Sequence, residues 1–230
     1  MKKANYFFNC SNLKLSILVF SVLIFTAANS AAAVEIIKIP VEKNEEDLYH
    51  IEAEIPILLG LKSKNVQSKY NDLFRDDIFC FLESTIEMAS QSQHNFAAAE
   101  IPMHQFEGIV DFEIKNNKQI FSIKFNYYQY TGGAHGNPYS LSYNIDLNSG
   151  EDLKLIDFLE RINLTLAEVE VLIKSEIEKN PANYFHGDYG FQSLEEDQHY
   201  YLEAGELVIY FQPYAVAPYS TGMPEFRVKY

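Results

Sequence analysis

The segment from Tyr127 to Pro138 (YYQYTGGAHGNP) holds the residue types in this chain that are best suited to binding or chemistry. Its closely spaced glycines allow positive φ and close backbone approach, and such a loop can present amide groups to an anion or carbonyl. A histidine there can donate, accept or titrate, and the neighbouring tyrosines are suited to stacking on sugar rings or anchoring an interface. The predicted contact residues are Thr131, Gly132, Gly133, His135 and Asn137.

A second aromatic cluster lies near the C-terminus, in the sequence YFQPYAVAPYSTG at 210–222. Its prolines and its glycine indicate a fixed loop between two strands. Tyr214 and Tyr219 can bury their rings and hydrogen-bond the loop, or they can contact a ligand. We include both tyrosines among the predicted binding residues, behind the glycine-rich loop.

The signatures of common enzyme classes are absent from the sequence, which has no GxSxG, P-loop, GxGxxG or HExxH motif. The histidines never occur as i,i+4 pairs, and the proximity of His186 to Asp188 in a loop gives little support to a metal site. Acidic runs such as 195–197 are typical of a solvated surface. We therefore expect no catalytic residue, no metal and no cofactor.

The N-terminal segment, residues 1–33, differs from the rest of the chain. It contains three lysines and no acid, and its apolar stretch over 15–25 has the length of a signal-peptide core. That stretch is too short to span a bilayer, and small residues that offer cleavage points follow it. The pattern predicts a cleavable signal peptide over 1–33 and a periplasmic or secreted protein. An uncleaved membrane anchor is the alternative.

The charge balance also restricts the partners. The chain has 18 Lys and Arg against 32 Asp and Glu, and loss of the three N-terminal lysines would change its net charge from −14 to −17. Such acidity argues against nucleic acid and against a polybasic grip on anionic lipid. It favours encounter with a basic protein. We expect no membrane span after signal cleavage.

Hydrophobic spacing predicts the elements that position the two loops. Steps of three and four residues indicate a helix over 65–88, and the capping box of Thr165 and Glu168 opens a second helix that ends near Asn180. The polar, alanine-rich stretch 91–104 is interpreted as a loop. Alternation and short apolar runs predict strands at 49–59, 106–114, 120–130, 140–147, 199–203, 207–211 and 226–230.

The order of these elements predicts an α+β fold, in which antiparallel sheets pack with two main helices. The strand–helix–strands block occurs twice. We therefore expect two related halves that form one compact unit.

Three stretches of the sequence resemble the PdaC/RsiV-like extracytoplasmic domain family: YTGGAHGNPY, YNIDLNSGEDLKLIDFL and LVIYFQPYAVAPYSTGMPEF. The resemblance implies tandem DUF4163 and DUF3298 domains, here 34–140 and 141–230, and an α+β fold. Members of the family include the extracytoplasmic part of lysozyme-sensing anti-sigma factors and the non-catalytic N-terminal part of certain peptidoglycan deacetylases. Neither a sigma-binding region nor a deacetylase catalytic domain is recognisable in this sequence.

These observations predict a secreted or periplasmic, non-catalytic binding module of the cell envelope. Its expected ligand is a protein such as lysozyme, or peptidoglycan glycan. One alternative is an envelope hydrolase or esterase that uses His135 with a nearby carboxylate. Another is a purely structural envelope protein.

Overall fold

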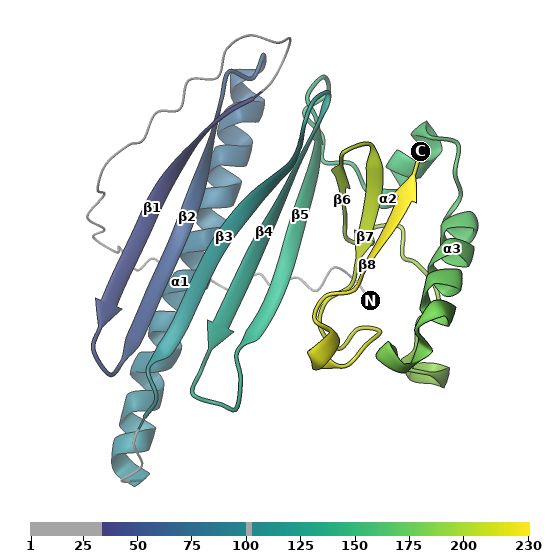
Figure 1. Ribbon diagram of the computed structural model, residues 1–230. Helices are drawn as coiled ribbons and strands as arrows, with labels where there is room; N and C mark the ends of the chain where they lie inside the picture. Colours follow the sequence, from purple (N-terminus) through teal and green to yellow (C-terminus); the bar gives the residue numbers. More distant parts are fainter. Residues whose placement is uncertain (1–33, 100–102) are drawn as a thin grey trace. The chain divides into compact units, whose positions relative to one another are not determined.

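The computed structural model describes residues 34–99 and 103–230 as a mixed α+β protein (Figure 1), which confirms the predicted fold class. The predicted signal peptide lies outside the described residues. The strands are β1 Glu35–Glu45, β2 Tyr49–Leu59, β3 Phe106–Asn117, β4 Ile120–Tyr130, β5 Asn137–Asp146, β6 Tyr200–Glu203, β7 Glu206–Tyr210 and β8 Glu225–Lys229. The α-helices are α1 Lys64–Ala99, α2 Leu155–Arg161 and α3 Leu166–Lys179.

The strands form a five-stranded sheet in the order β1-β2-β3-β4-β5 and a three-stranded sheet in the order β6-β7-β8. β1 and β2 pair antiparallel, as do the neighbours in the smaller sheet. β2 and β3, however, pair parallel, with Tyr49 opposite Phe106 and Ala53 opposite Val110. The expectation of purely antiparallel sheets is therefore corrected. α1 lies between these two strands in the chain, and a helical crossover of this kind is what a parallel pair requires.

The described residues group into two compact units rather than the single one expected. The N-terminal unit contains residues 34–112 and 125–138, and the C-terminal unit contains residues 113–124 and 139–230. β3 and β4 each contribute to both units because the hairpin between them, residues 113–124, belongs to the C-terminal unit. The assignment of 34–140 and 141–230 to two related domains remains a prediction.

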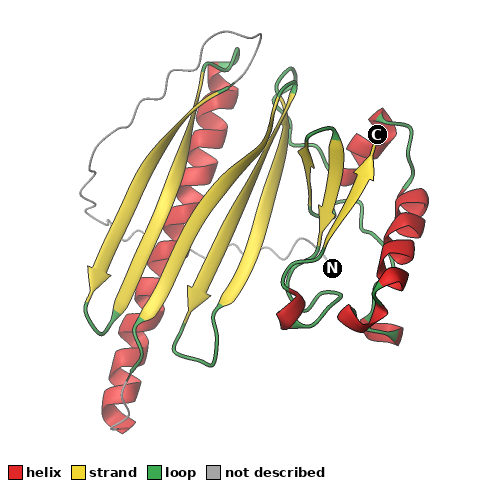
Figure 2. Cartoon of the chain, viewed as in Figure 1, coloured by secondary structure: helices red, strands yellow, loops and turns green. Residues whose placement is uncertain are grey.

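The core of the N-terminal unit lies between α1 and the sheet (Figure 2). The rings of Phe74 and Phe125 lie 4.9 Å apart between centroids, and those of Phe81 and Tyr127 lie 5.2 Å apart. Gly108 permits a close approach, because a Cβ there would lie 2.9 Å from the Thr85 Oγ1 on α1. Apolar side chains at helical spacing thus hold α1 against the strands.

α1 is longer than the apolar spacing indicates. It continues through Gln91 to Ala99, so the interpretation of this part of 91–104 as a loop is wrong. Alanine and glutamine favour helix even where no apolar stripe marks the helix in the sequence. Within the described residues, none of the helices combines the length and apolarity needed to cross a bilayer.

The core of the C-terminal unit forms where α2 and α3 pack with the three-stranded sheet. Val169 and Ile173 of α3 are fully buried in the same apolar cluster as Leu207 of β7. The predicted capping box is confirmed, since Thr165 Oγ1 accepts a hydrogen bond from the Glu168 amide and the Glu168 carboxylate accepts one from the Thr165 amide at 2.8 Å. This arrangement satisfies two amides that would otherwise lack partners at the start of α3.

Candidate functional site

The glycine-rich loop connects β4 to β5 in the N-terminal unit. Of the predicted contact residues in this loop, Thr131, Gly133, His135 and Asn137 are exposed, whereas Gly132 is partly buried. Gly132 has φ of +84°, a conformation that glycine adopts at little cost. The loop therefore presents its polar side chains to solvent around one left-handed glycine.

Gly136 fixes the end of this loop against β4. A Cβ at this position would lie 2.3 Å from the Tyr128 ring, so the ring packs directly on the glycine backbone. This contact explains why the third glycine of the loop is required. It also restrains the exposed residues Thr131 to His135 from their C-terminal side.

His135 makes a local backbone contact. Its Nδ1 lies 2.9 Å from the Gly136 carbonyl oxygen, which accepts a hydrogen bond when that nitrogen carries the proton. The side chain is exposed, as a surface contact residue would be. Among the residues that the structure describes, no group of three or more His, Cys, Asp or Glu is arranged to hold a metal ion.

The predicted tyrosine pair lies in the C-terminal unit, so it is described separately from the glycine-rich loop. The Tyr214 and Tyr219 rings have centroids 5.7 Å apart and planes inclined by 33°. Tyr214 is 55% exposed and has φ of +65°. The structure thus brings together the two tyrosines that the sequence singled out.

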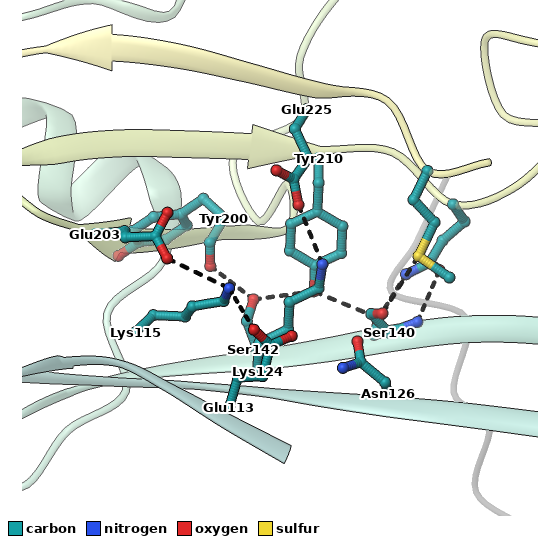
Figure 3. A network of polar contacts seen from close by, with 12 residues as sticks. Glu113, Lys115, Lys124, Asn126, Ser140, Ser142, Tyr200, Glu203, Tyr210 and Glu225 are labelled. Atoms are coloured by element: carbon teal, nitrogen blue, oxygen red, sulfur yellow. Dashed lines mark hydrogen bonds and ion pairs between the residues drawn. The ribbon is translucent and has the colours of Figure 1, made fainter. Parts of the chain in front are cut away.

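The structure also contains a buried ionic and aromatic cluster that the sequence did not predict (Figure 3). Lys124 Nζ of β4 lies 3.2 Å from Glu225 Oε1 of β8 and 4.8 Å from the centroid of the Tyr210 ring. The same ammonium group lies 5.4 Å from the Tyr201 ring centroid. Lys124, Tyr201 and Tyr210 are all buried, and burial raises the pKa of both tyrosine hydroxyls. These tyrosines therefore stay neutral around the lysine.

A second lysine extends this cluster along the β3–β4 hairpin. Lys115 Nζ lies 2.8 Å from Glu113 Oε2 and 3.4 Å from Glu203 Oε1. Burial by itself would lower the pKa of Lys115, but the two carboxylates outweigh it and raise that pKa. Burial would raise the pKa of Glu203, but Arg227 and Lys115 lower it. Lys115 and Glu203 thus remain charged near neutral pH.

Side chains of the larger sheet satisfy the backbone of β6, an edge strand of the smaller sheet. Ser142 Oγ donates to the Tyr200 carbonyl at 2.6 Å, and Ser122 Oγ accepts from the Leu202 amide at 3.0 Å. Tyr210 OH in turn donates to Ser142 Oγ at 3.1 Å. An edge that would otherwise leave polar groups unpaired is covered in this way.

The cluster was missed because its residues look like the solvent side of a strand. Ser122 and Lys124 alternate with apolar residues in the sequence, a pattern that predicts an exposed face. Glu225, with which Lys124 pairs, lies 101 positions further along the chain. No local signal could indicate a pairing over that distance.

Comparisons with known protein families match two separate segments of the chain. Residues 42–138 match the family model described as "Deacetylase PdaC", and residues 159–230 match that of DUF3298, a protein of unknown function. No curated protein matches the chain. The DUF4163 assignment expected for the N-terminal half remains a prediction.

Two solved structures match the chain, and the first of them has the same fold. A DUF3298 family member from Bacteroides fragilis is 18% identical with a TM-score of 0.64, over 88% of this chain and 92% of that chain. A DUF3298 family protein from Pseudomonas aeruginosa is 19% identical with a TM-score of 0.49, over 87% of this chain and 92% of that chain. The chain therefore combines a segment similar to PdaC with a segment similar to DUF3298, on the fold found in the Bacteroides fragilis protein.

Proposed function

We propose that this protein is an exported, non-catalytic binding module of the cell envelope, and that the loop Thr131–Asn137 is its contact surface. The matches to the PdaC and DUF3298 models support an extracytoplasmic, envelope-associated role. The proposed partner is a basic protein such as lysozyme. Peptidoglycan glycan is the second ligand class.

The observation that carries this proposal is an exposed loop that is held in place. Thr131, His135 and Asn137 are exposed, while Gly136 lies under the Tyr128 ring and His135 bonds the adjacent carbonyl. A loop that is already ordered loses less conformational entropy on binding. This arrangement suits recognition of a surface.

The charge of the chain favours a protein partner over an anionic wall polymer. A net charge of −14, or −17 after loss of the N-terminal lysines, would attract a basic protein and accelerate its encounter. The same charge would repel anionic polymers of the envelope. Binding should therefore weaken as salt screens this attraction.

The hydrolase alternative makes a different prediction for the same loop. It requires His135 to act as a base or acid on a bound substrate, oriented by a carboxylate. His135 is exposed, and its Nδ1 lies 2.9 Å from the Gly136 carbonyl oxygen. We therefore propose a contact role for His135, and His135→Ala should weaken binding without abolishing any hydrolytic activity of the purified protein.

Titration with lysozyme at low and moderate salt, followed by calorimetry, tests the proposal. We expect saturable binding that weakens with salt, and the variant Thr131→Ala/His135→Ala/Asn137→Ala should bind on the order of tenfold or more weakly. His94→Ala is the matched control, because His94 is also exposed and its Nδ1 contacts a backbone carbonyl, that of Ser90 on α1.

The control variant should bind like the wild type. Absence of saturable binding at concentrations on the order of tens of micromolar would exclude the lysozyme partner. Equal affinity of the loop variant and the wild type would exclude the loop as the contact surface.

A further inference from the structure

We propose that Tyr214 and Tyr219 form a stacking platform for an uncharged glycan. This site goes beyond the function proposed above, because it lies in the C-terminal unit and uses none of the residues of the glycine-rich loop. The centroids of the two rings lie 5.7 Å apart. The face of a sugar ring that carries C–H groups packs well on such rings.

Tyr214 combines an unfavourable backbone conformation with an exposed aromatic side chain. Its φ of +65° lies in the left-handed region, where a side chain with a Cβ is disfavoured. The residue is 55% exposed, so burial offers little compensation. Strained residues that persist in a structure cluster at ligand-binding sites.

The loop that carries the pair is anchored to the rest of the C-terminal unit. Val216 and Ala217, between the two tyrosines in sequence, are buried. The Phe185 amide donates to the Val216 carbonyl at 2.9 Å, and Thr221 Oγ1 donates to the Asn183 carbonyl at 3.1 Å. The loop is therefore ordered before any ligand arrives, which lowers the cost of binding.

The absence of charged residues in the segments around the tyrosine pair favours an uncharged ligand. The chain contains no charged residue from Leu207 to Pro224, although it has 32 Asp and Glu in total. The segment 180–187, which the two hydrogen bonds place beside this loop, has no Lys, Arg, Asp or Glu either. A basic protein would be drawn to the acidic parts of the molecule. A neutral sugar, with apolar faces and hydroxyl edges, fits an aromatic loop that carries no charged side chain of its own.

The test uses chitotetraose as the probe and the tyrosine fluorescence of the protein as the readout, since the chain has no Trp. Tyr214→Gly removes the ring and also relieves the strained backbone. We expect this variant to bind chitotetraose on the order of tenfold or more weakly while its melting temperature stays equal or rises. Tyr214→Phe, which keeps the ring, should bind like the wild type.

Tyr189→Ala is the matched control, because Tyr189 is 83% exposed in the same unit and has an unstrained φ. It should leave the affinity unchanged. The variant Thr131→Ala/His135→Ala/Asn137→Ala should also retain glycan binding, which separates this site from the one proposed for the glycine-rich loop. A parallel co-sedimentation with purified peptidoglycan sacculi and with cellulose identifies the source of the sugar.

Two results would overturn the glycan site. One is the absence of chitotetraose binding at concentrations on the order of millimolar, together with no co-sedimentation with either polysaccharide. The other is unchanged affinity of Tyr214→Gly. If Tyr214→Gly weakens lysozyme binding while no glycan binds, the pair contacts protein and the glycan proposal is wrong.

Discussion

The three glycines of the loop between β4 and β5 have different physical roles. Gly132 supplies a positive φ, Gly136 leaves space for the Tyr128 ring, and Gly133 has open space where a Cβ would be. The sequence predicts a loop that needs glycine, because such clusters mark unusual backbone conformations. The sequence does not indicate which glycine has a positive φ and which leaves space for a side chain, because the contact with Tyr128 forms only in the folded protein.

Substitution of these glycines should separate the roles. Gly136→Ala places a methyl group against the Tyr128 ring, and we expect a loss of about 1–3 kcal/mol in the free energy of unfolding, as for other overpacked sites. Gly133→Ala should change it by less than about 0.5 kcal/mol, as surface substitutions usually do. Urea denaturation of both variants measures the difference. Equal stability of the two variants would show that the Tyr128 ring moves aside freely.

At the scale of elements, the sequence predicted the features that depend on residues close together in the chain. The capping box at Thr165 and the strand Ile120–Tyr130 are present as expected. β1 was missed because its apolar residues are interrupted by Pro40 and flanked by charges, a composition that edge strands tolerate. The parallel pairing of β2 with β3 was missed because α1 separates them in sequence.

β3 is longer than the predicted strand 106–114. It continues through Asn117, so only Lys118 and Gln119 connect it to β4. The Asn116 side chain donates to the Ile120 carbonyl at 2.7 Å and links the end of one strand to the start of the next.

Two lysines allow the buried cluster of the β3–β4 hairpin to be tested against a surface equivalent. Lys124 and Lys38 each have a carboxylate partner and lie 4.8 Å from the centroid of an aromatic ring, but the Lys124 side chain is 9% exposed and that of Lys38 is 54% exposed. We expect Lys124→Ala to lower the free energy of unfolding by about 1–3 kcal/mol, because the buried lysine loses its ion pair with the partly exposed Glu225 and its ring contacts.

Lys38→Ala should cost less than about 1 kcal/mol, since exposed ion pairs contribute little. Urea denaturation of both variants provides the comparison. Similar losses for the two variants would mean that burial does not strengthen the Lys124 cluster. That outcome would show that the Lys124 cluster stabilises the C-terminal unit no more than an exposed ion pair does.

At the scale of the whole molecule, the free energy of unfolding depends on pH through carboxylates whose pKa changes on folding. Burial alone would raise the pKa of Asp146, but Arg161, whose Nη1 lies 2.6 Å from its Oδ2, and the Asn148 amide lower it. A carboxyl whose pKa is lower in the folded state stabilises the fold above its unfolded pKa. This contribution is lost as the pH falls through the folded value.

Asp146→Asn should therefore destabilise the protein most at neutral pH. We expect the difference in free energy of unfolding between wild type and variant to be constant from pH 7 to about 5 and to shrink below about pH 4. Urea titrations across this range measure it, with exposed Asp188→Asn as the control. A difference that does not change with pH would show that the effect is steric rather than ionic.

The discontinuous composition of the C-terminal unit has a consequence for biosynthesis. The hairpin 113–124 is translated long before its partners, and the bond between Lys124 and Glu225 closes a loop of 101 residues. Such high contact order slows folding, because loop entropy is lost before the contacts form. The unit can close only after β8 has been synthesised. A fragment that begins at residue 141 would leave the buried faces of Tyr201 and Tyr210 without Lys124, and the Leu202 amide without Ser122.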